Sequence, residues 1–379
     1  MNDLREPAVS QLESGATLSV DLAAIVRNWR TLQAVCGEAE CGAVVKADAY
    51  GVGLEPVVRE LSAAGCKTYF VAHVFEGRRA RAIDASAIIY VLNGLVPGTA
   101  PAYLEHGLRP VLCSLPEIEE WLQFCALFGR RSAEGETLPA ALQLDTGLNR
   151  LGLRLDQIER AADLTESLNI KLILSQFIWS GQSNLARCET QVSLFESMRQ
   201  PWKQVPASIA NSAGIFLERT PLYDLVRPGY ALYGGNPAPG RPNPMQGVLR
   251  LEARILQVNH VEQGETVGYD GRYLAKSPRR LATISIGYAD GIPRSALGSE
   301  VHPGGEVVVK GVRCPFVGRV SMDLTVVDIT LAPEAMRGDT VELIGKAISI
   351  DELATRSRTI GYEILTNLGS RFYRRYTHL

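Results

Sequence analysis

The strongest constraint on the fold is an alternation of short apolar runs with amphipathic segments between about residues 40 and 235. The runs are nearly continuous in apolar and β-forming residues, which is typical of parallel strands that are covered on both faces. Eight runs have this character: 41–47, 68–73, 87–93, 109–113, 140–145, 171–177, 206–210 and 224–228.

The segments between these runs have helical patterns, clearest in 54–65, 116–129 and 155–168. Eight successive strand-then-helix units predict an α/β fold of the (β/α)8 barrel type. An open, doubly wound sheet is the alternative. Such a sheet normally has a glycine-rich turn after its first strand, and VKADAYGVG at 45–53 matches that fingerprint poorly.

The pattern changes from about residue 248 onward. The later segments are rich in Val, Ile and Thr, are punctuated by Gly and Pro, and contain few helical stretches, which predicts a mostly antiparallel β domain. The proline- and glycine-rich stretch 234–247 is the natural boundary. We therefore expect a barrel domain over residues 1–240 and a C-terminal β domain over 241–379. The first residues are candidates for an extra strand of the second domain.

Composition narrows the function classes. Hydrophobic residues make up 46% and charged residues 21% of the chain, as in ordinary globular proteins. A net charge of −2 gives no strong field for nucleic acid or a membrane surface, and neither a signal-peptide core nor a membrane-spanning run is present. The seven cysteines are odd in number and lack a C-x-x-C pair. They indicate reduced thiols in a cytoplasmic protein, with neither disulfides nor a zinc site.

Catalytic groups of a barrel come from the C-terminal ends of its strands. The residues at these ends are Lys46, Asp145 with Arg150, Gln176, Asn211 with Ser212, and Arg227 with Gly229. A lysine inside an apolar run is unusual, and burial would lower its pKa toward the range used in covalent carbonyl chemistry. On this feature alone, a lysine that snorkels from a strand end is an equally good interpretation.

The last two strand ends favour a phosphate site. Phosphate groups commonly bind the loops after strands 7 and 8 of a barrel. ANSAG at 210–214 offers the hydroxyl of Ser212 and backbone N–H groups, and RPGY at 227–230 places Gly229 where backbone can approach a ligand closely. A lysine and a phosphate site in one barrel mouth together suggest pyridoxal 5'-phosphate.

Seven motifs in order carry a resemblance to a known family: AVVKADAYGVG (43–53), LDTGLNRLG (144–152), ANSAG (210–214), VRPGYALYGG (226–235), VGYDGRY (267–273), IGYADGIPR (286–294) and VGRVSMD (317–323). Together they resemble alanine racemases, which are fold-type III pyridoxal-phosphate enzymes. The resemblance covers nearly the whole chain and both expected domains. It implies an amino-acid racemase that interconverts L- and D-alanine in a homodimer with shared active sites.

The resemblance also implies roles for individual residues. Lys46 would hold the cofactor covalently, and Tyr269 of the partner subunit would be the second base on the opposite face of the substrate. Arg227 would face the pyridine nitrogen of the cofactor. The remaining cofactor-binding residues, chiefly around the phosphate, would be Tyr50, Asn211, Ser212, Gly229 and Tyr230. The substrate side would comprise Arg150 and the backbone N–H of Met322 at the carboxylate, with Tyr288, Arg294, Arg319 and Asp323 near the entrance.

This chain departs from the family pattern at four positions. Gln176 and Ser208 stand where the family often has histidines that support the tyrosine base and the pyridine-facing arginine. Gln143 stands near a lysine that some members carbamylate to position the equivalent of Arg150. Ser370 stands near a tyrosine that touches the cofactor region in some members. The two-base core is unchanged, but its supporting network must be rebuilt.

Three other functions stay open. The smaller Ser370 suggests a wider pocket and a racemase that also accepts serine or other small amino acids. A barrel-type amino-acid decarboxylase usually has an acidic residue at the pyridine nitrogen, and Arg227 argues against it. A non-enzymatic pyridoxal-phosphate-binding protein needs no β domain, so the segment that contains Tyr269 argues against that. Supply of wall precursors and alanine catabolism are both compatible with the sequence.

Overall fold

The computed structural model describes residues 10–128, 137–178, 184–299 and 304–378, and these form two compact units. We call the first the barrel unit; it comprises Ile25–Leu232 and Asn236–Met245. We call the second the β unit; it comprises the described part of Met1–Ala24, then Tyr233–Gly235 and Gln246–Leu379.

The barrel unit is built on parallel strands. Seven of them form one sheet in the order of the chain. They are β3 (Ala43–Val44), β4 (Thr68–Val71), β5 (Ile88–Val91), β6 (Arg109–Leu112), β7 (Pro139–Gln143), β8 (Asn169–Leu174) and β9 (Ala207–Ser208). Nearly all their residues are buried, because helices cover the outer face and side chains fill the interior.

An eighth strand position links the two ends of this sheet. Strand β10 (Leu225–Val226) pairs in parallel with β2 (Glu40–Cys41), which directly precedes β3. On one side Val44 N–H donates to Pro228 O at 2.9 Å, and on the other Arg227 N–H donates to Ala210 O at 2.9 Å. The predicted barrel is confirmed, and each of the eight apolar runs contains a strand.

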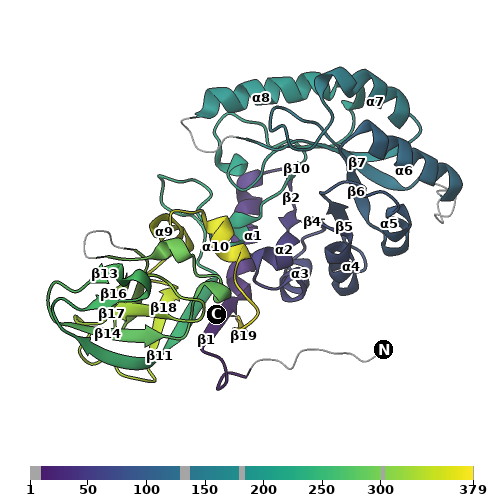
Figure 1. Ribbon diagram of the computed structural model, residues 1–379. Coiled ribbons are helices and arrows are strands. Elements are labelled where there is room, and N and C mark those ends of the chain that lie inside the picture. Colours follow the sequence, from purple (N-terminus) through teal and green to yellow (C-terminus); the bar gives the residue numbers. More distant parts are fainter. Residues whose placement is uncertain (1–9, 129–136, 179–183, 300–303, 379) are drawn as a thin grey trace. The chain divides into compact units, whose positions relative to one another are not determined.

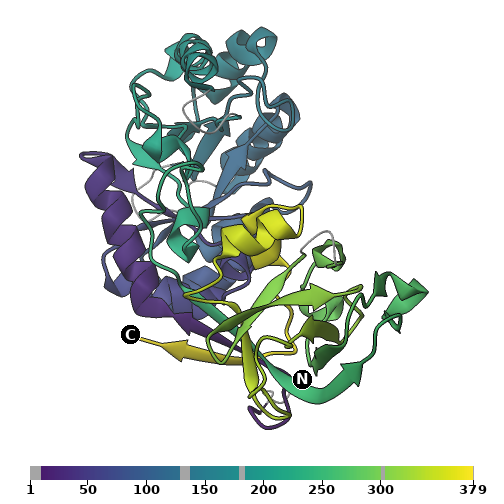
Figure 2. The ribbon, with the colours of Figure 1, turned by 90° about the vertical axis from the view of Figure 1, so that its left-hand side faces the viewer.

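Helices cover the outside of the barrel strands (Figure 1). The longest, α1, is the purple helix that stands upright in Figure 2. The helices of this unit are α1 (Leu22–Cys36), α2 (Lys46–Tyr50), α3 (Leu54–Ala63), α4 (Val74–Ile83), α5 (Ala100–His106), α6 (Leu115–Phe128), α7 (Ile158–Thr165) and α8 (Leu185–Met198). Short 3-10 turns follow at η2 (Leu155–Gln157), η4 (Gln200–Trp202), η5 (Gly214–Phe216) and η6 (Tyr230–Tyr233).

The β unit contains one large sheet in the order β14-β17-β16-β15-β18-β11-β1-β19, in which β14 also pairs with β11. The strands are β1 (Ala16–Asp21), β11 (Leu249–Val261), β14 (Arg279–Ile284), β15 (Glu306–Val309), β16 (Val312–Val317), β17 (Thr325–Asp328), β18 (Thr340–Ile344) and β19 (Tyr373–Thr377). A small hairpin adds β12 (Thr266–Val267) and β13 (Tyr273–Leu274). All pairings are antiparallel except that of β1 with β19. The predicted β domain is confirmed as mostly antiparallel.

Strands β15 and β17 of the β unit alternate buried and partly exposed side chains, because only one face of the sheet packs on the core. Two short helices, α9 (Ile350–Arg356) and α10 (Gly361–Thr366), follow β18. The 3-10 turns η7 (Tyr269–Gly271), η8 (Tyr288–Asp290) and η9 (Arg294–Ala296) lie in loops of this unit.

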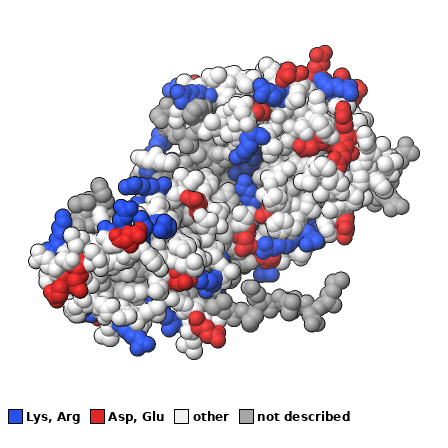
Figure 3. Space-filling view, viewed as in Figure 1, with Lys and Arg blue, Asp and Glu red and all other residues white. Residues whose placement is uncertain are grey.

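The surface and the thiols show no unusual feature. On the face drawn in Figure 3, basic and acidic side chains are interspersed. All seven cysteines lie within the described residues, and each is buried and outside any disulfide. Within the described ranges, no helix combines the length and the apolar character that a bilayer crossing requires.

Candidate active site

Lys46 begins an unusual turn. The strand predicted over 41–47 ends at Val44, and the next residues coil in the left-handed sense: Ala47, Asp48, Ala49 and Tyr50 all have φ between 53° and 55°. Residues with a Cβ atom resist this conformation by roughly 1–2 kcal/mol each. The prediction of a strand through residue 47 was therefore wrong at its last three residues.

Contacts from within and outside the turn offset this strain. Within it, Ala49 N–H donates to Val45 O at 2.9 Å and Gly51 N–H donates to Ala47 O at 2.8 Å. From outside, Arg79 of α4 donates to Asp48 Oδ1 at 2.7 Å. Such strain persists only where the surroundings over-determine it, and it is concentrated at functional sites.

Burial and nearby charges change the pKa of the Lys46 amine. Burial lowers the pKa of Lys46 below its usual 10.5, and the positive charges of Arg150 and Arg227 lower it further. Glu76 opposes this effect. A lysine with a lowered pKa is more often uncharged and can act as a nucleophile or a base near neutral pH.

Arg227 lies in the barrel interior and is only 5% exposed. Its guanidinium donates to Ser208 Oγ at 2.5 Å, to Ser175 O at 2.5 Å and to Gln176 Oε1 at 3.1 Å. These acceptors are all neutral, and burial lowers the pKa of Arg227 to about 10. Gln176 and Ser208, the residues at the two positions where we expected a rebuilt network, therefore both bind Arg227 directly.

Ser212, Gly229 and Tyr50 form a compact polar cluster. Ser212 Oγ accepts the N–H groups of Gly229 and Ala231 at 3.0 and 3.1 Å, an arrangement that leaves the hydroxyl proton available for an anion. A Cβ atom on Gly229 would lie 2.5 Å from Tyr50 Oη, so only glycine fits here without a shift. Tyr230 follows in η6 and is buried, and Asn211 Oδ1 accepts the N–H of Gly214 at 3.0 Å.

Arg150 lies in an exposed loop after β7. Gln143 bonds the backbone of this loop, where its Nε2 donates to Leu151 O at 3.0 Å. Asp145 Oδ1 accepts the N–H groups of Gly147 and Asn149 at 3.0 Å each. Both side chains thus shape the loop that contains Arg150. Gln143 does so through the loop backbone, at a position near the lysine that some family members carbamylate.

The candidates of the β unit lie on neighbouring loops of that unit. Tyr288 N–H donates to Ser321 O at 3.0 Å, and Ala289 N–H donates to Met322 O at 2.9 Å. Tyr269 begins η7 and is 66% exposed; the next residue, Asp270, forms an ion pair with Arg319. Arg319 and Arg294 also line one shallow hollow.

Sequence reasoning missed Arg371 in these loops and Glu76 in α4 of the barrel unit. Arg371 donates to Asp323 Oδ1 at 2.7 Å and to the buried Asp290 Oδ1 at 2.8 Å. Glu76 contacts the peptide after Lys46. Its place three residues into a helical pattern is a capping signal that could have identified it.

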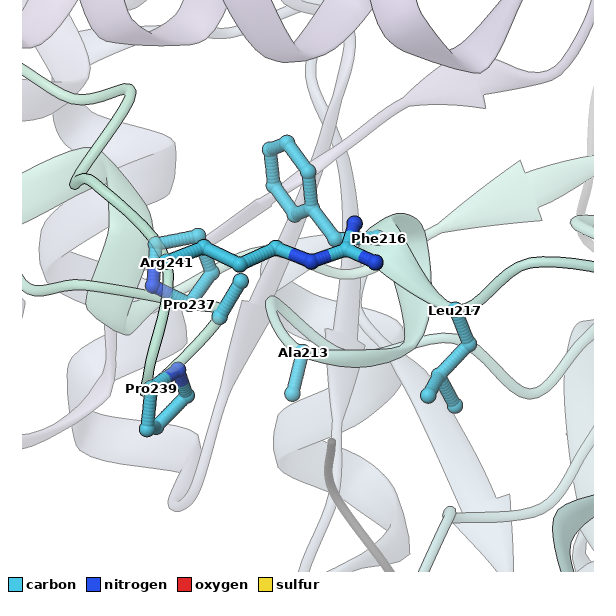
Figure 4. Close-up of a pocket in the computed structure, with 7 residues that line it drawn as sticks. Ala213, Phe216, Leu217, Pro237, Pro239 and Arg241 are labelled. Atoms are coloured by element: carbon cyan, nitrogen blue, oxygen red, sulfur yellow. The ribbon is translucent and has the colours of Figure 1, made fainter. Parts of the chain in front are cut away.

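A separate pocket in the barrel unit contains none of the candidate residues. Ala213, Phe216, Leu217 and the proline-rich segment 237–239 line it, and the side chain of Arg241 extends across it (Figure 4). Arg241 forms an ion pair with Glu218 at 3.0 Å. The pocket has one cation, already paired, and carries no catalytic chemistry.

Comparisons with known proteins agree with this geometry. Residues 20–237 match the family model for the N-terminal domain of alanine racemase, and residues 248–376 match that for its C-terminal domain. The chain is 51% identical to an alanine racemase of Methylobacterium nodulans, over 96% of both chains, and 43% identical to a catabolic alanine racemase of Mesorhizobium japonicum, over 97% of this chain and 95% of the relative. Its structure matches that of the Bartonella henselae alanine racemase with covalently bound pyridoxal phosphate, with a TM-score of 0.88, 37% identity, and coverage of 98% and 100% of the two chains. The chain therefore belongs to the alanine racemase family.

Proposed function

We propose that this protein interconverts L- and D-alanine with pyridoxal 5'-phosphate, using Lys46 and the partner subunit's Tyr269 as two bases. The observation that carries the proposal is the setting of Lys46. Its amine has a lowered pKa in a barrel mouth that also contains the buried cation Arg227. The pyridoxal phosphate that is covalently bound in the Bartonella henselae relative supports the same chemistry.

The residues present fit the cofactor. Lys46 would hold the cofactor covalently. The phosphate of the cofactor would bind at the cluster of Ser212, Gly229 and Tyr50, where a Cβ atom on residue 229 would collide with Tyr50. Tyr230 and Asn211 would complete this end, and Arg227 would face the pyridine nitrogen. When bound, the cofactor withdraws electrons from the substrate's α-carbon and so makes its proton easier to remove.

Proton exchange at the α-carbon needs a donor and an acceptor on opposite faces. Lys46 Nζ would serve one face and Tyr269 Oη of the partner the other. The exposure of Tyr269 suits a residue that reaches into another subunit, so we infer a two-fold homodimer. Arg150 and the Met322 N–H would bind the substrate carboxylate, and Tyr288 and Asp323 would line the entrance.

The proposal includes the cytoplasm as the site of action. Seven buried cysteines outside disulfides are ordinary in a reducing compartment and unusual in an oxidising one. This part is independent of the catalytic assignment.

Substitution of the lysine tests the function directly. Lys46→Ala should lose racemisation of alanine by roughly 100- to 10,000-fold or more, together with the visible absorbance of bound cofactor after dialysis. Lys67→Ala, on an exposed residue of the same unit, is the matched control and should change neither. Comparable alanine racemisation by Lys46→Ala would refute the assignment, and rates on serine beside alanine measure the substrate range.

A further inference from the structure

Glu76 is a buried acid that contacts three backbone N–H groups. It is the third residue of α4, and only 3% of it is exposed. Oε2 accepts the N–H groups of Ala72 and His73 at 2.8 and 3.1 Å, which caps the first turn of the helix. Oε1 accepts the N–H of Ala47 at 2.7 Å. Glu76 therefore ties the start of α4 to the peptide that follows Lys46.

The Ala47 N–H lies at the start of the left-handed turn, where the first N–H groups of a helical turn have no partner of their own. Its bond to Glu76 fixes the plane of the peptide that joins Lys46 to Ala47. The direction in which the Lys46 side chain leaves the backbone depends on that plane. A contact 29 residues away in the sequence thus acts on the orientation of the lysine.

The same arrangement occurs a second time, away from the candidate site. Glu117 is the third residue of α6, and its Oε2 accepts the N–H of Cys113 at 3.0 Å and the N–H of Leu95 at 3.1 Å. Each acid joins the start of its own helix to the loop after a neighbouring strand of the sheet. Glu76 of α4, which follows β4, reaches the loop after β3, and Glu117 of α6, which follows β6, reaches the loop after β5. The loop held by Glu117 contains none of the candidate residues, so Glu117 provides a matched control.

We propose that Glu76 is a positioning residue for Lys46, holding the left-handed turn through the Ala47 N–H so that the amine is directed into the barrel mouth. The inference rests on the proposed role of Lys46. A carboxylate suits this place because both of its oxygens accept hydrogen bonds. The negative charge also favours the protonated form of Lys46, whereas the charges of Arg150 and Arg227 disfavour it.

Two substitutions separate the contact from the charge. Glu76→Gln keeps the length but turns an NH2 group toward one of the N–H donors, so a contact is lost together with the charge. Glu76→Asp keeps the charge but is one methylene shorter and cannot reach both sides. Glu117→Gln makes the first change at the control position.

Hydrogen exchange of the cofactor-free protein is the primary measurement. In Glu76→Gln the remaining oxygen should stay with the two N–H groups at the start of α4, and in Glu76→Asp the shorter carboxylate should do the same, which leaves Ala47 without its acceptor. The Ala47 amide should therefore exchange roughly tenfold faster or more in both variants. In Glu117→Gln, the Leu95 amide should respond instead and Ala47 should stay as in the parent. Unchanged Ala47 exchange in the two Glu76 variants would overturn the proposal. Should Glu76→Gln fail to fold, Glu76→Asp decides alone.

The reactivity of Lys46 toward a small acylating anhydride gives a second readout. Loss of the carboxylate should lower the Lys46 pKa further and raise labelling near pH 7 by up to about tenfold in Glu76→Gln, with much less change in Glu76→Asp. With cofactor bound, both variants should lower kcat more than they raise KM, and Glu117→Gln should do neither. Equal labelling and kinetics in Glu76→Gln and Glu117→Gln would count against a role specific to Lys46. Ala47 exchange does not depend on racemase activity, so this proposal and the proposed function can fail separately.

Discussion

The two proposed bases lie in different surroundings: Lys46 in the mouth of the barrel unit, among buried polar groups, and Tyr269 in an exposed turn of the β unit. In the barrel mouth, the buried guanidinium of Arg227 is bonded to residues of and after β8 and β9, and the peptide that follows Lys46 is bonded to the buried Glu76. Tyr269 is 66% exposed and belongs to a three-residue turn whose neighbour forms an exposed ion pair. Substitutions in the mouth should therefore change folding, cofactor binding and catalysis together, whereas those at the turn should change catalysis alone.

Tyr269→Phe should give the largest effect of this set. Removing the hydroxyl of a base should lower racemisation by roughly 100- to 10,000-fold, while the free energy of unfolding and the cofactor affinity stay unchanged because the side chain is exposed. Chiral chromatography of the alanine product and thermal unfolding measure the two properties. Tyr376→Phe, at another partly exposed tyrosine of the β unit, should leave racemisation unchanged. A large loss of stability in Tyr269→Phe would contradict the expectation that substitutions at this turn change catalysis alone.

Gly229→Ala tests the crowding of the mouth. The added methyl group would lie 2.5 Å from Tyr50 Oη, and overpacking of this kind costs about 1–3 kcal/mol. Cofactor titration should show at least about tenfold weaker binding. Gly247→Ala is the control, since a Cβ atom there meets nothing within 4 Å and its backbone is not in the left-handed region. Equal affinities in the two variants would show that the cluster has more room than the distance implies.

Ser208→Ala tests the rebuilt support of Arg227. The change removes an acceptor of the guanidinium and a donor to Leu225 O in a fully buried place, so unfolding should become easier by about 1–3 kcal/mol. Denaturant unfolding measures this, with the exposed Ser193→Ala as the control. A loss no greater than that of the control would mean that Ser175 and Gln176 suffice to hold Arg227.

Asp270→Asn should have the smallest effect. It removes an exposed ion pair with Arg319, and such pairs contribute at most about 1 kcal/mol. Asparagine also tolerates the positive φ of this position, which is 60°. Thermal unfolding should shift little, and high salt should reduce the difference from the parent further. A salt-independent loss of stability would indicate that the turn is more firmly held than its exposure suggests.

Much of the fold could be predicted because it depends on local pattern. All eight apolar runs contain barrel strands, and the change to Val-, Ile- and Thr-rich segments after residue 248 marks the strands of the β unit. The helix predicted over 54–65 is α3, and that over 116–129 is α6 within the described residues. The prediction over 155–168 divides into η2 and α7.

The left-handed turn could not be predicted in this way. Ala47, Asp48 and Ala49 have no intrinsic preference for positive φ, and the contacts that hold them come from Glu76 and Arg79, 29 and 31 residues further along the chain. The strand ends did identify Lys46, Arg227, Ser212 and Gly229. The hydrogen-bond partners of Gln143 and Ser208 could not be predicted, because they include backbone atoms that only the folded chain brings close. The roles of the site residues stay predictions.

The pairing of β1 with β19 and β11 bears on how the chain can fold during synthesis. Thr17 lies opposite Tyr373 in parallel register and opposite Glu252 in antiparallel register. Since a strand can pair only with strands that have already been synthesised, β1 has no sheet partner while the barrel residues are translated, and its edge toward β19 stays open until residues 373–377 have followed. The barrel can fold during this interval, whereas the sheet of the β unit is completed only once β19 exists.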